Sequence, residues 1–206
     1  MKAINSLNSY CLLLSVFFLP ISMNLNNIFL LLFIASSAII IFSKPIINSR
    51  TLLKNNIGIL IIATLPFLLN ALGLLYTDEL EDGINYTIRA LPFLFLPTIA
   101  ICAPMIFRAN FNKMGYALVA GCLIVAMYSW TTTLIEIQQL NKPIKELFGP
   151  LYSHHKLVKD LGLHASYLSI FIYTSIGFLV SQIERMNKKR KIISFIVIVF
   201  LTGFLF

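Results

Sequence analysis

The residues best placed for chemistry lie in a short polar stretch between two apolar runs. Asp82, Tyr86 and Arg89 are spaced i, i+4, i+7, so on a helix they share one face. The planar guanidinium of Arg89 is suited to hold a phosphate or pyrophosphate through two parallel hydrogen bonds. The alternative is that Arg89 reaches up to lipid headgroups or pairs with Asp82. Arg89 and Tyr86 are therefore candidate substrate-binding residues.

A second candidate surface begins at His164. His164, Tyr167, Leu168 and Phe171 are spaced i, i+3, i+4, i+7, which places them on one face of a helix. Imidazole and phenol groups at the end of such a helix can transfer protons or hydrogen-bond to a sugar. The alternative is an aromatic belt at the membrane interface, with His164 as an amphipathic filler. His164 and Tyr167 join the candidate list.

No metal site or other cofactor site is expected. His154 and His155 precede His164, but no carboxylate or Cys stands at a spacing suited to zinc. The three Cys, at positions 11, 102 and 122, fall inside apolar runs and predict neither a redox motif nor a disulfide framework. The chain also lacks a Gly-rich phosphate loop, a nucleophile elbow and a zinc-protease helix.

The composition identifies the elements that must position these residues. Hydrophobic residues make up 58% of the 206 and charged residues 12%, with a mean hydropathy of +0.86; soluble chains are about 25% charged. The formal net charge of +8 would suggest nucleic acid in a soluble protein. Here the basic residues lie between long apolar runs, so we expect no nucleic-acid partner. The sequence predicts an all-α, polytopic transmembrane helix bundle in contact with membrane lipid.

Seven charge-free stretches predict the spans. Backbone polar groups in lipid must be satisfied within the segment, so these stretches are expected to be helices. They form a single transmembrane domain over residues 1–206. The predicted spans are 6–22, 27–43, 57–76, 90–107, 115–135, 165–183 and 192–206.

Charge predicts the orientation of these spans. Strict alternation places 11 basic residues on one side and five on the other, together with seven of the eight acids. The side rich in Lys and Arg is cytoplasmic by the positive-inside rule. We therefore expect a cytoplasmic N-terminus, cytoplasmic connections at 44–56, 108–114 and 184–191, and outward segments at 77–89 and 136–164. The basic run 188–191 is expected to anchor the topology against anionic lipid.

Three further expectations concern the spans themselves. Pro92, Pro97 and Pro104 should kink span 90–107, and the lone Asn70 should form an interhelical hydrogen bond. Residues 1–23 are expected to be a retained helix, with a cleaved signal peptide as the alternative. The last run ends at Phe206 without a polar exit, so the chain is expected to be the N-terminal part of a larger protein and inactive alone.

Two segments resemble a known superfamily. Residues 72–77 (Leu-Gly-Leu-Leu-Tyr-Thr), the acidic stretch after them and Arg89-Ala90-Leu91-Pro92 resemble the early extracytoplasmic loop and next helix of O-antigen ligase-like proteins. Residues 163–169 resemble the His-x-x-Tyr-Leu entry to a later helix in the same superfamily, which includes O-antigen polymerases. The resemblance covers about residues 60–180.

The resemblance implies a metal-independent glycosyltransferase of a bacterial inner membrane. Such a protein moves a glycan from a polyprenyl pyrophosphate carrier to lipid A-core or another glycolipid or glycan acceptor on the periplasmic side. The superfamily's largest periplasmic loop normally lies beyond the seventh span, so this chain ends before it. The alternatives are a transporter or flippase of lipid-linked sugars, which predicts repeats and charges within spans, and a non-catalytic structural membrane protein.

Overall fold

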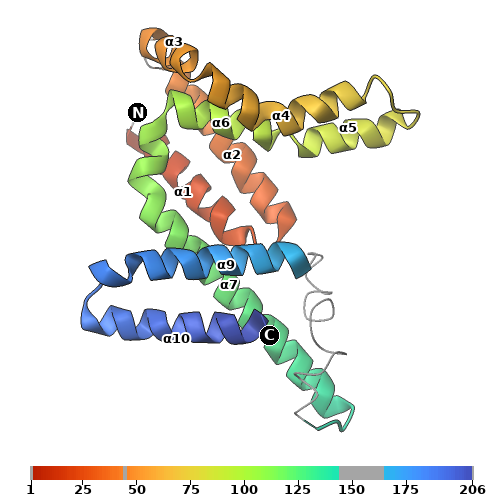
Figure 1. Cartoon of the computed structure of the whole chain (residues 1–206), viewed down its shortest axis with the longest axis vertical. Coiled ribbons are helices and arrows are strands. Elements are labelled where there is room, and N and C mark those ends of the chain that lie inside the picture. Colours follow the sequence, from red (N-terminus) through yellow and green to blue (C-terminus); the bar gives the residue numbers. More distant parts are fainter. Residues whose placement is uncertain (1, 44–45, 144–164, 206) are drawn as a thin grey trace. The chain divides into compact units, whose positions relative to one another are not determined.

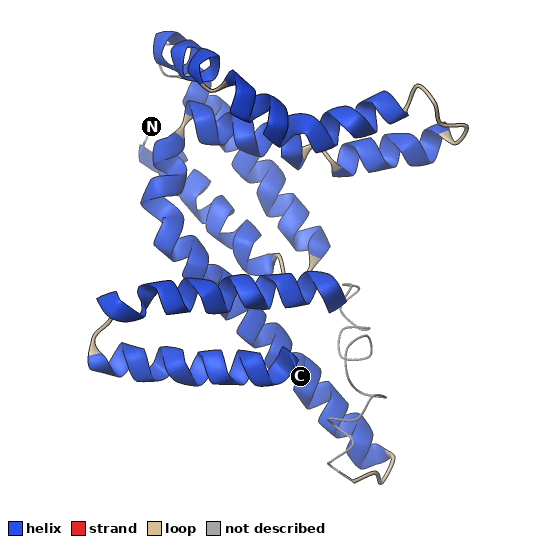
Figure 2. Cartoon of the chain, in the orientation of Figure 1, coloured by secondary structure: helices blue, strands red, loops and turns tan. Residues whose placement is uncertain are grey.

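The computed structural model describes residues 2–43, 46–143 and 165–205, and within them every regular element is a helix (Figure 2). The all-α prediction is confirmed for this part of the chain. In chain order the helices are α1 (Lys2–Phe18), α2 (Met23–Phe42), α3 (Ile46–Asn55), α4 (Ile57–Gly73), α5 (Leu80–Arg89), α6 (Pro92–Cys102), α7 (Pro104–Gln139), α9 (Ala165–Gln182), the 3₁₀ turn η3 (Ile183–Arg185) and α10 (Lys188–Leu205) (Figure 1).

Four stretches among the described residues are long and apolar enough to cross a membrane: Met23–Phe42, Leu80–Cys102, Pro104–Gln139 and Ala165–Arg185. The predicted spans at 6–22 and 57–76 form shorter apolar helices, Ile4–Phe18 and Ile57–Gly73. The last run lies in α10, whose first turn contains four basic residues. By length and composition the described helices thus support a membrane protein with four such helices rather than seven.

The predicted connection at 108–114 is wrong. These residues lie inside α7, a helix of 36 residues, and the break falls earlier, at Ala103. Arg108 and Lys113 mark polar surface, but Lys and Arg are good helix formers and do not end a helix. Pro104 does end one, because it has no N–H and is favoured at a first helical position. Ala103 before it accordingly leaves the helical region, at φ −138° and ψ 57°.

The chain divides into two compact units, which we describe separately. Unit 1 comprises Met1–Tyr10 and Leu31–Asn110, and unit 2 comprises Cys11–Leu30 and Phe111–Phe206. In unit 1, α4 packs against both α5 and α6, and α3 packs against α4 and α6. The chain turns back after α4, so that α4 with α5 and α6 makes one helical hairpin (Figure 1).

Unit 2 is built on a stripe along α7. Leu118, Cys122, Val125 and Ala126 are buried at helical spacing, which makes one apolar face. This face packs against the hairpin of α9 and α10, which contributes Leu168, Ile172, Leu201 and Phe204 to the same buried cluster.

Glycine allows close approach at two places on α7. A Cβ at Gly115 would overlap the ring of Phe178, and a Cβ at Gly121 would overlap the backbone carbonyl oxygen of Phe17. Small residues at such points let membrane helices pack closely.

Candidate functional site

The polar stretch singled out in the sequence is an amphipathic helix, α5. Leu80, Ile84 and Ile88 recur every four residues along one side and are all exposed, while the opposite side carries polar residues. Gly83 lies against α4, because a Cβ there would come within 2.8 Å of Leu74 Cδ2 and 3.0 Å of Thr77 Cγ2. A helix of this kind, with its apolar side uncovered by the described residues, is suited to a membrane surface.

Charge along α5 follows the helix dipole. Glu81 and Asp82 lie in the first turn, near the positive end, and Arg89 lies in the last turn, near the negative end. Before them, Thr77 begins the turn, since its Oγ1 accepts a hydrogen bond from the Glu79 amide at 3.3 Å. The arrangement stabilises a helix of only ten residues that would be marginal in isolation.

The structure brings together two of the four candidate residues. The Arg89 guanidinium carbon lies 5.9 Å from the centroid of the Tyr86 ring, within the range of a cation–π contact worth about 0.5–1 kcal/mol at an exposed site. Both side chains are exposed. Arg89 and Asp82, which the structure describes, form no ion pair with each other, and their positions are two helical turns apart.

The other two candidates are not joined to this pair. His164, with His154 and His155, lies outside the described residues. Tyr167 lies in the first turn of α9 and is 54% exposed. It belongs to unit 2, whereas Tyr86 and Arg89 belong to unit 1. Among the described residues no group of three or more His, Cys, Asp or Glu is placed to hold a metal ion.

The proline and asparagine predictions need correction. Only Pro97 lies inside a helix of the predicted span, since Pro92 stands at the start of α6 and Pro104 at the start of α7. Both positions suit proline, because a first-turn N–H would have no helical partner. Asn70 forms its hydrogen bond within its own helix, from Nδ2 to the Pro66 carbonyl at 2.8 Å, and not between helices.

Interhelical asparagine bonds do occur in unit 1, at residues that the sequence did not single out. Asn8 of α1 is 1% exposed and its Nδ2 lies 2.9 Å from Ser36 Oγ and 2.7 Å from Ser37 Oγ, both on α2. Asn110 of α7 donates to Ser9 Oγ at 3.1 Å. Such bonds hold helices together in lipid, where stray polar groups are costly. In unit 2, the buried Ser129 hydroxyl has no hydrogen-bond partner among the described residues.

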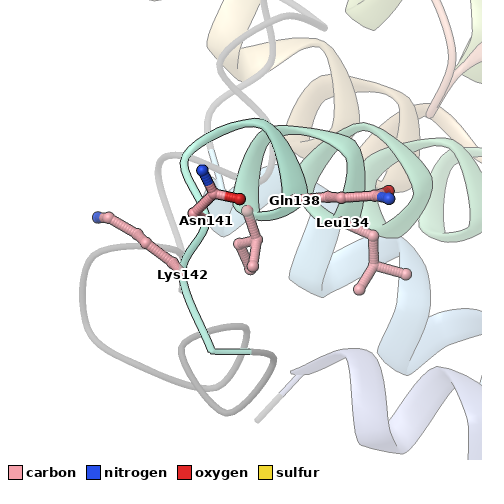
Figure 3. A pocket seen from close by; sticks show the side chains of 5 residues that line it. Leu134, Gln138, Asn141 and Lys142 are labelled. Atoms are coloured by element: carbon pink, nitrogen blue, oxygen red, sulfur yellow. The ribbon is translucent and has the colours of Figure 1, made fainter.

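An open pocket of about 540 Å³ lies at the C-terminal end of α7 (Figure 3). Its position follows from a Schellman cap, in which the Lys142 amide donates to the Ile137 carbonyl and the Asn141 amide to the Gln138 carbonyl. Asn141 takes the required left-handed conformation, at φ 51°. Asn followed two residues later by Pro was a usable signal for this helix end. The pocket is lined by Leu134, Ile137, Gln138, Asn141 and Lys142.

The lining of the pocket combines polar and aliphatic side chains. The amides of Gln138 and Asn141 can each donate and accept hydrogen bonds, and the aliphatic side chains offer an apolar wall. The carbonyls at a helix C-terminus disfavour anions, an effect that Lys142 offsets.

No family model, no curated protein and no solved structure matches the chain.

Proposed function

We propose that the chain belongs to an inner-membrane glycosyltransferase of the O-antigen ligase-like type. It would take a glycan from a polyprenyl pyrophosphate carrier and pass it to lipid A-core or another glycan or glycolipid acceptor at the periplasmic face. The resemblance of residues 72–97 and 163–169 to that superfamily supports the proposal. So does the apolar, all-helical character of the described residues.

The observation that carries the proposal is the position of Arg89. Its exposed guanidinium lies at the junction between the amphipathic α5 and the apolar α6, against the Tyr86 ring. A carrier lipid presents its pyrophosphate at the headgroup level and its tail in the bilayer. A cation at the junction of a polar and an apolar helix suits such a lipid, because the pyrophosphate would meet the cation and the tail would lie beside apolar residues.

The chemistry follows from the leaving group. The acceptor oxygen bonds to the anomeric carbon of the glycan while the bond from that carbon to the pyrophosphate oxygen breaks. The bonding pair leaves with the pyrophosphate, so negative charge grows there, and Arg89 would stabilise it. A general base must take the proton that the acceptor hydroxyl loses, and the sequence offers His164, with Tyr167 three residues after it, as the candidate for that role. No metal or other cofactor enters this scheme.

The topology that we propose has a cytoplasmic N-terminus and an outward-facing acidic segment at 77–89. The charge asymmetry of the connecting segments supports it.

The test is photo-crosslinking of the reconstituted chain with a polyprenyl pyrophosphate that bears a diazirine in its tail. We expect Arg89→Ala and Arg89→Lys each to lower labelling by about 10- to 100-fold, since a hydrogen bond to a charged group is worth about 1.5–3 kcal/mol and Lys lacks the guanidinium fork. Arg108→Ala and Arg108→Lys, at another exposed arginine, are the matched controls and should label like the wild type.

Each outcome separates the proposal from its alternatives. Full labelling of Arg89→Lys would mean that Arg89 acts only as a positive charge toward headgroups. It would contradict the proposed hydrogen bonding of the guanidinium to pyrophosphate. Equal labelling of all variants would favour a membrane protein without this chemistry. Asp82→Asn should label like the wild type, because Asp82 does not hold Arg89 in an ion pair. A loss equal to that of Arg89→Ala would show that the two act as a pair.

A further inference from the structure

The turn between α9 and α10 carries the densest positive charge among the described residues. Residues 184–191 contain five cationic side chains and one carboxylate, and all six are exposed. We call this segment the basic tip. Its cations are Arg185, Lys188, Lys189, Arg190 and Lys191.

Helix geometry spreads these charges around the start of α10. Four consecutive residues, 188–191, are each turned by about 100° from the last, so their side chains form a ring around the axis. The apolar part of the helix begins directly after them, with Ile192 and Ile193 exposed by 55% and 53%. The ring therefore lies within about one helical turn of side chains suited to lipid.

The ring is electrostatically unfavourable on its own. The first turn of α10 holds four cations and no acid, and the positive end of the helix dipole lies there as well. The cap is neutral, because the Arg190 amide donates to Asn187 Oδ1 at 3.0 Å. Bound anions would relieve both the repulsion among the side chains and that with the dipole.

The tip is held in place by the packing behind it. The Ser194 hydroxyl donates to the Met186 sulfur at 3.1 Å, and Ser194 is 6% exposed. Helices α9 and α10 pack together on either side of the turn. The charges are thus presented on a fixed scaffold, which lowers the entropy lost when a ligand binds.

We infer that the basic tip is a binding site for the headgroup phosphates of anionic phospholipids. Lipid is the chosen occupant because the ring borders an exposed apolar surface, so that headgroup and acyl chain can be bound together. A free phosphate would meet only the charged half of this surface. The inference does not depend on the proposed glycan transfer.

The experiment is native mass spectrometry of the purified chain in neutral detergent, titrated with phosphatidylglycerol, phosphatidylcholine or inorganic phosphate. The test variant is Lys188→Gln/Lys189→Gln/Lys191→Gln, and Lys54→Gln/Arg108→Gln/Lys113→Gln is a control with the same loss of charge elsewhere. We expect phosphatidylglycerol affinity to fall roughly fivefold for each charge removed from the tip. The control should keep its affinity within about twofold.

Two further measurements keep the result clear if the triple variant does not fold. Lys188→Arg/Lys189→Arg/Lys191→Arg keeps the charge and should bind as the wild type does, and wild-type binding should weaken steeply between low and high salt. Equal affinity for phosphatidylcholine, salt-independent binding, or equal losses in tip and control variants would overturn the inference. Competition by inorganic phosphate at lipid-equivalent concentration would also overturn it, in favour of a free-phosphate site.

Discussion

Two helical hairpins of this chain differ in both charge and packing. The hairpin of α4 with α5 and α6 turns through an acidic segment, with Asp78, Glu79, Glu81 and Asp82, and α5 has no buried residue. The hairpin of α9 and α10 turns through the basic tip and contributes to a buried core, with Ile172 and Leu201 at 0% exposure. The first hairpin carries the candidate residues Tyr86 and Arg89 on a lightly packed helix. The second carries the basic tip on a firmly packed pair of helices. Ligand-binding segments commonly come from the less stable parts of a structure.

The largest expected effect concerns the packed hairpin. Ile172→Ala in α9 removes a side chain that is 0% exposed, and should lower the free energy of unfolding by about 2–5 kcal/mol, as large-to-small core changes do. Ile84→Ala in α5 removes a side chain that is 43% exposed and is the matched control. Thermal unfolding of both variants in one detergent measures the difference. Equal shifts in unfolding temperature would show that the two hairpins do not differ in packing.

The next effect concerns the close approach at α7. Gly121→Ala places a Cβ against the Phe17 carbonyl oxygen, which is backbone and cannot rotate away, so we expect a loss of about 1–3 kcal/mol from overpacking. Gly177→Ala in α9 meets nothing within 4 Å and should leave stability unchanged or slightly raised. The same thermal assay checks both. A neutral Gly121→Ala would mean that α1 and α7 are not held together at this point.

A smaller loss is expected in the acidic hairpin. In Gly83→Ala the new Cβ meets side-chain methyl groups of Leu74 and Thr77, which can rotate, so the cost should stay below about 1 kcal/mol. It should nevertheless change how α5 packs on α4, and hydrogen exchange of the α5 amides is the sensitive measurement. Unchanged exchange would show that α5 is not supported by α4.

The smallest effect concerns the dipole of α5. Glu81→Gln removes one acid from its first turn, worth about 0.3–1 kcal/mol at low salt. The loss should disappear at high salt, since exposed charges are screened. Circular dichroism of the variant at two salt concentrations measures it, and a salt-independent loss would point to a contact other than the dipole.

Helix content was largely predictable from this sequence, whereas the helix ends and polar contacts were only partly so. Long charge-free runs had to be helices if they lie in lipid, and those described are. The break between α6 and α7 was misplaced because charge was taken as the signal, while Pro104 sets it. The pairing of Asn8 with Ser36 and Ser37 could not be predicted, because it depends on how α1 meets α2 and not on any local pattern.

The candidate site was likewise only partly predictable from the sequence. Spacing alone put Tyr86 and Arg89 near one another on α5, because i and i+3 positions are neighbours on any helix. The Schellman cap that shapes the pocket at Asn141 involves residues that the sequence treated as the start of a loop. Helix ends of this kind depend on a few backbone hydrogen bonds, so hydropathy does not detect them.

The proposed topology, which rests on the charge asymmetry of the sequence, puts the acidic turn outside the membrane with Arg89 and the basic tip in the cytoplasm. Asp82→Cys and Lys189→Cys, introduced singly after replacement of the native cysteines at 11, 102 and 122 by Ala, test it directly. A membrane-impermeant thiol reagent added to intact cells should label Cys at 82, and should label Cys at 189 only after the cells are opened. Reversed labelling, or labelling of both positions in intact cells, would contradict the account.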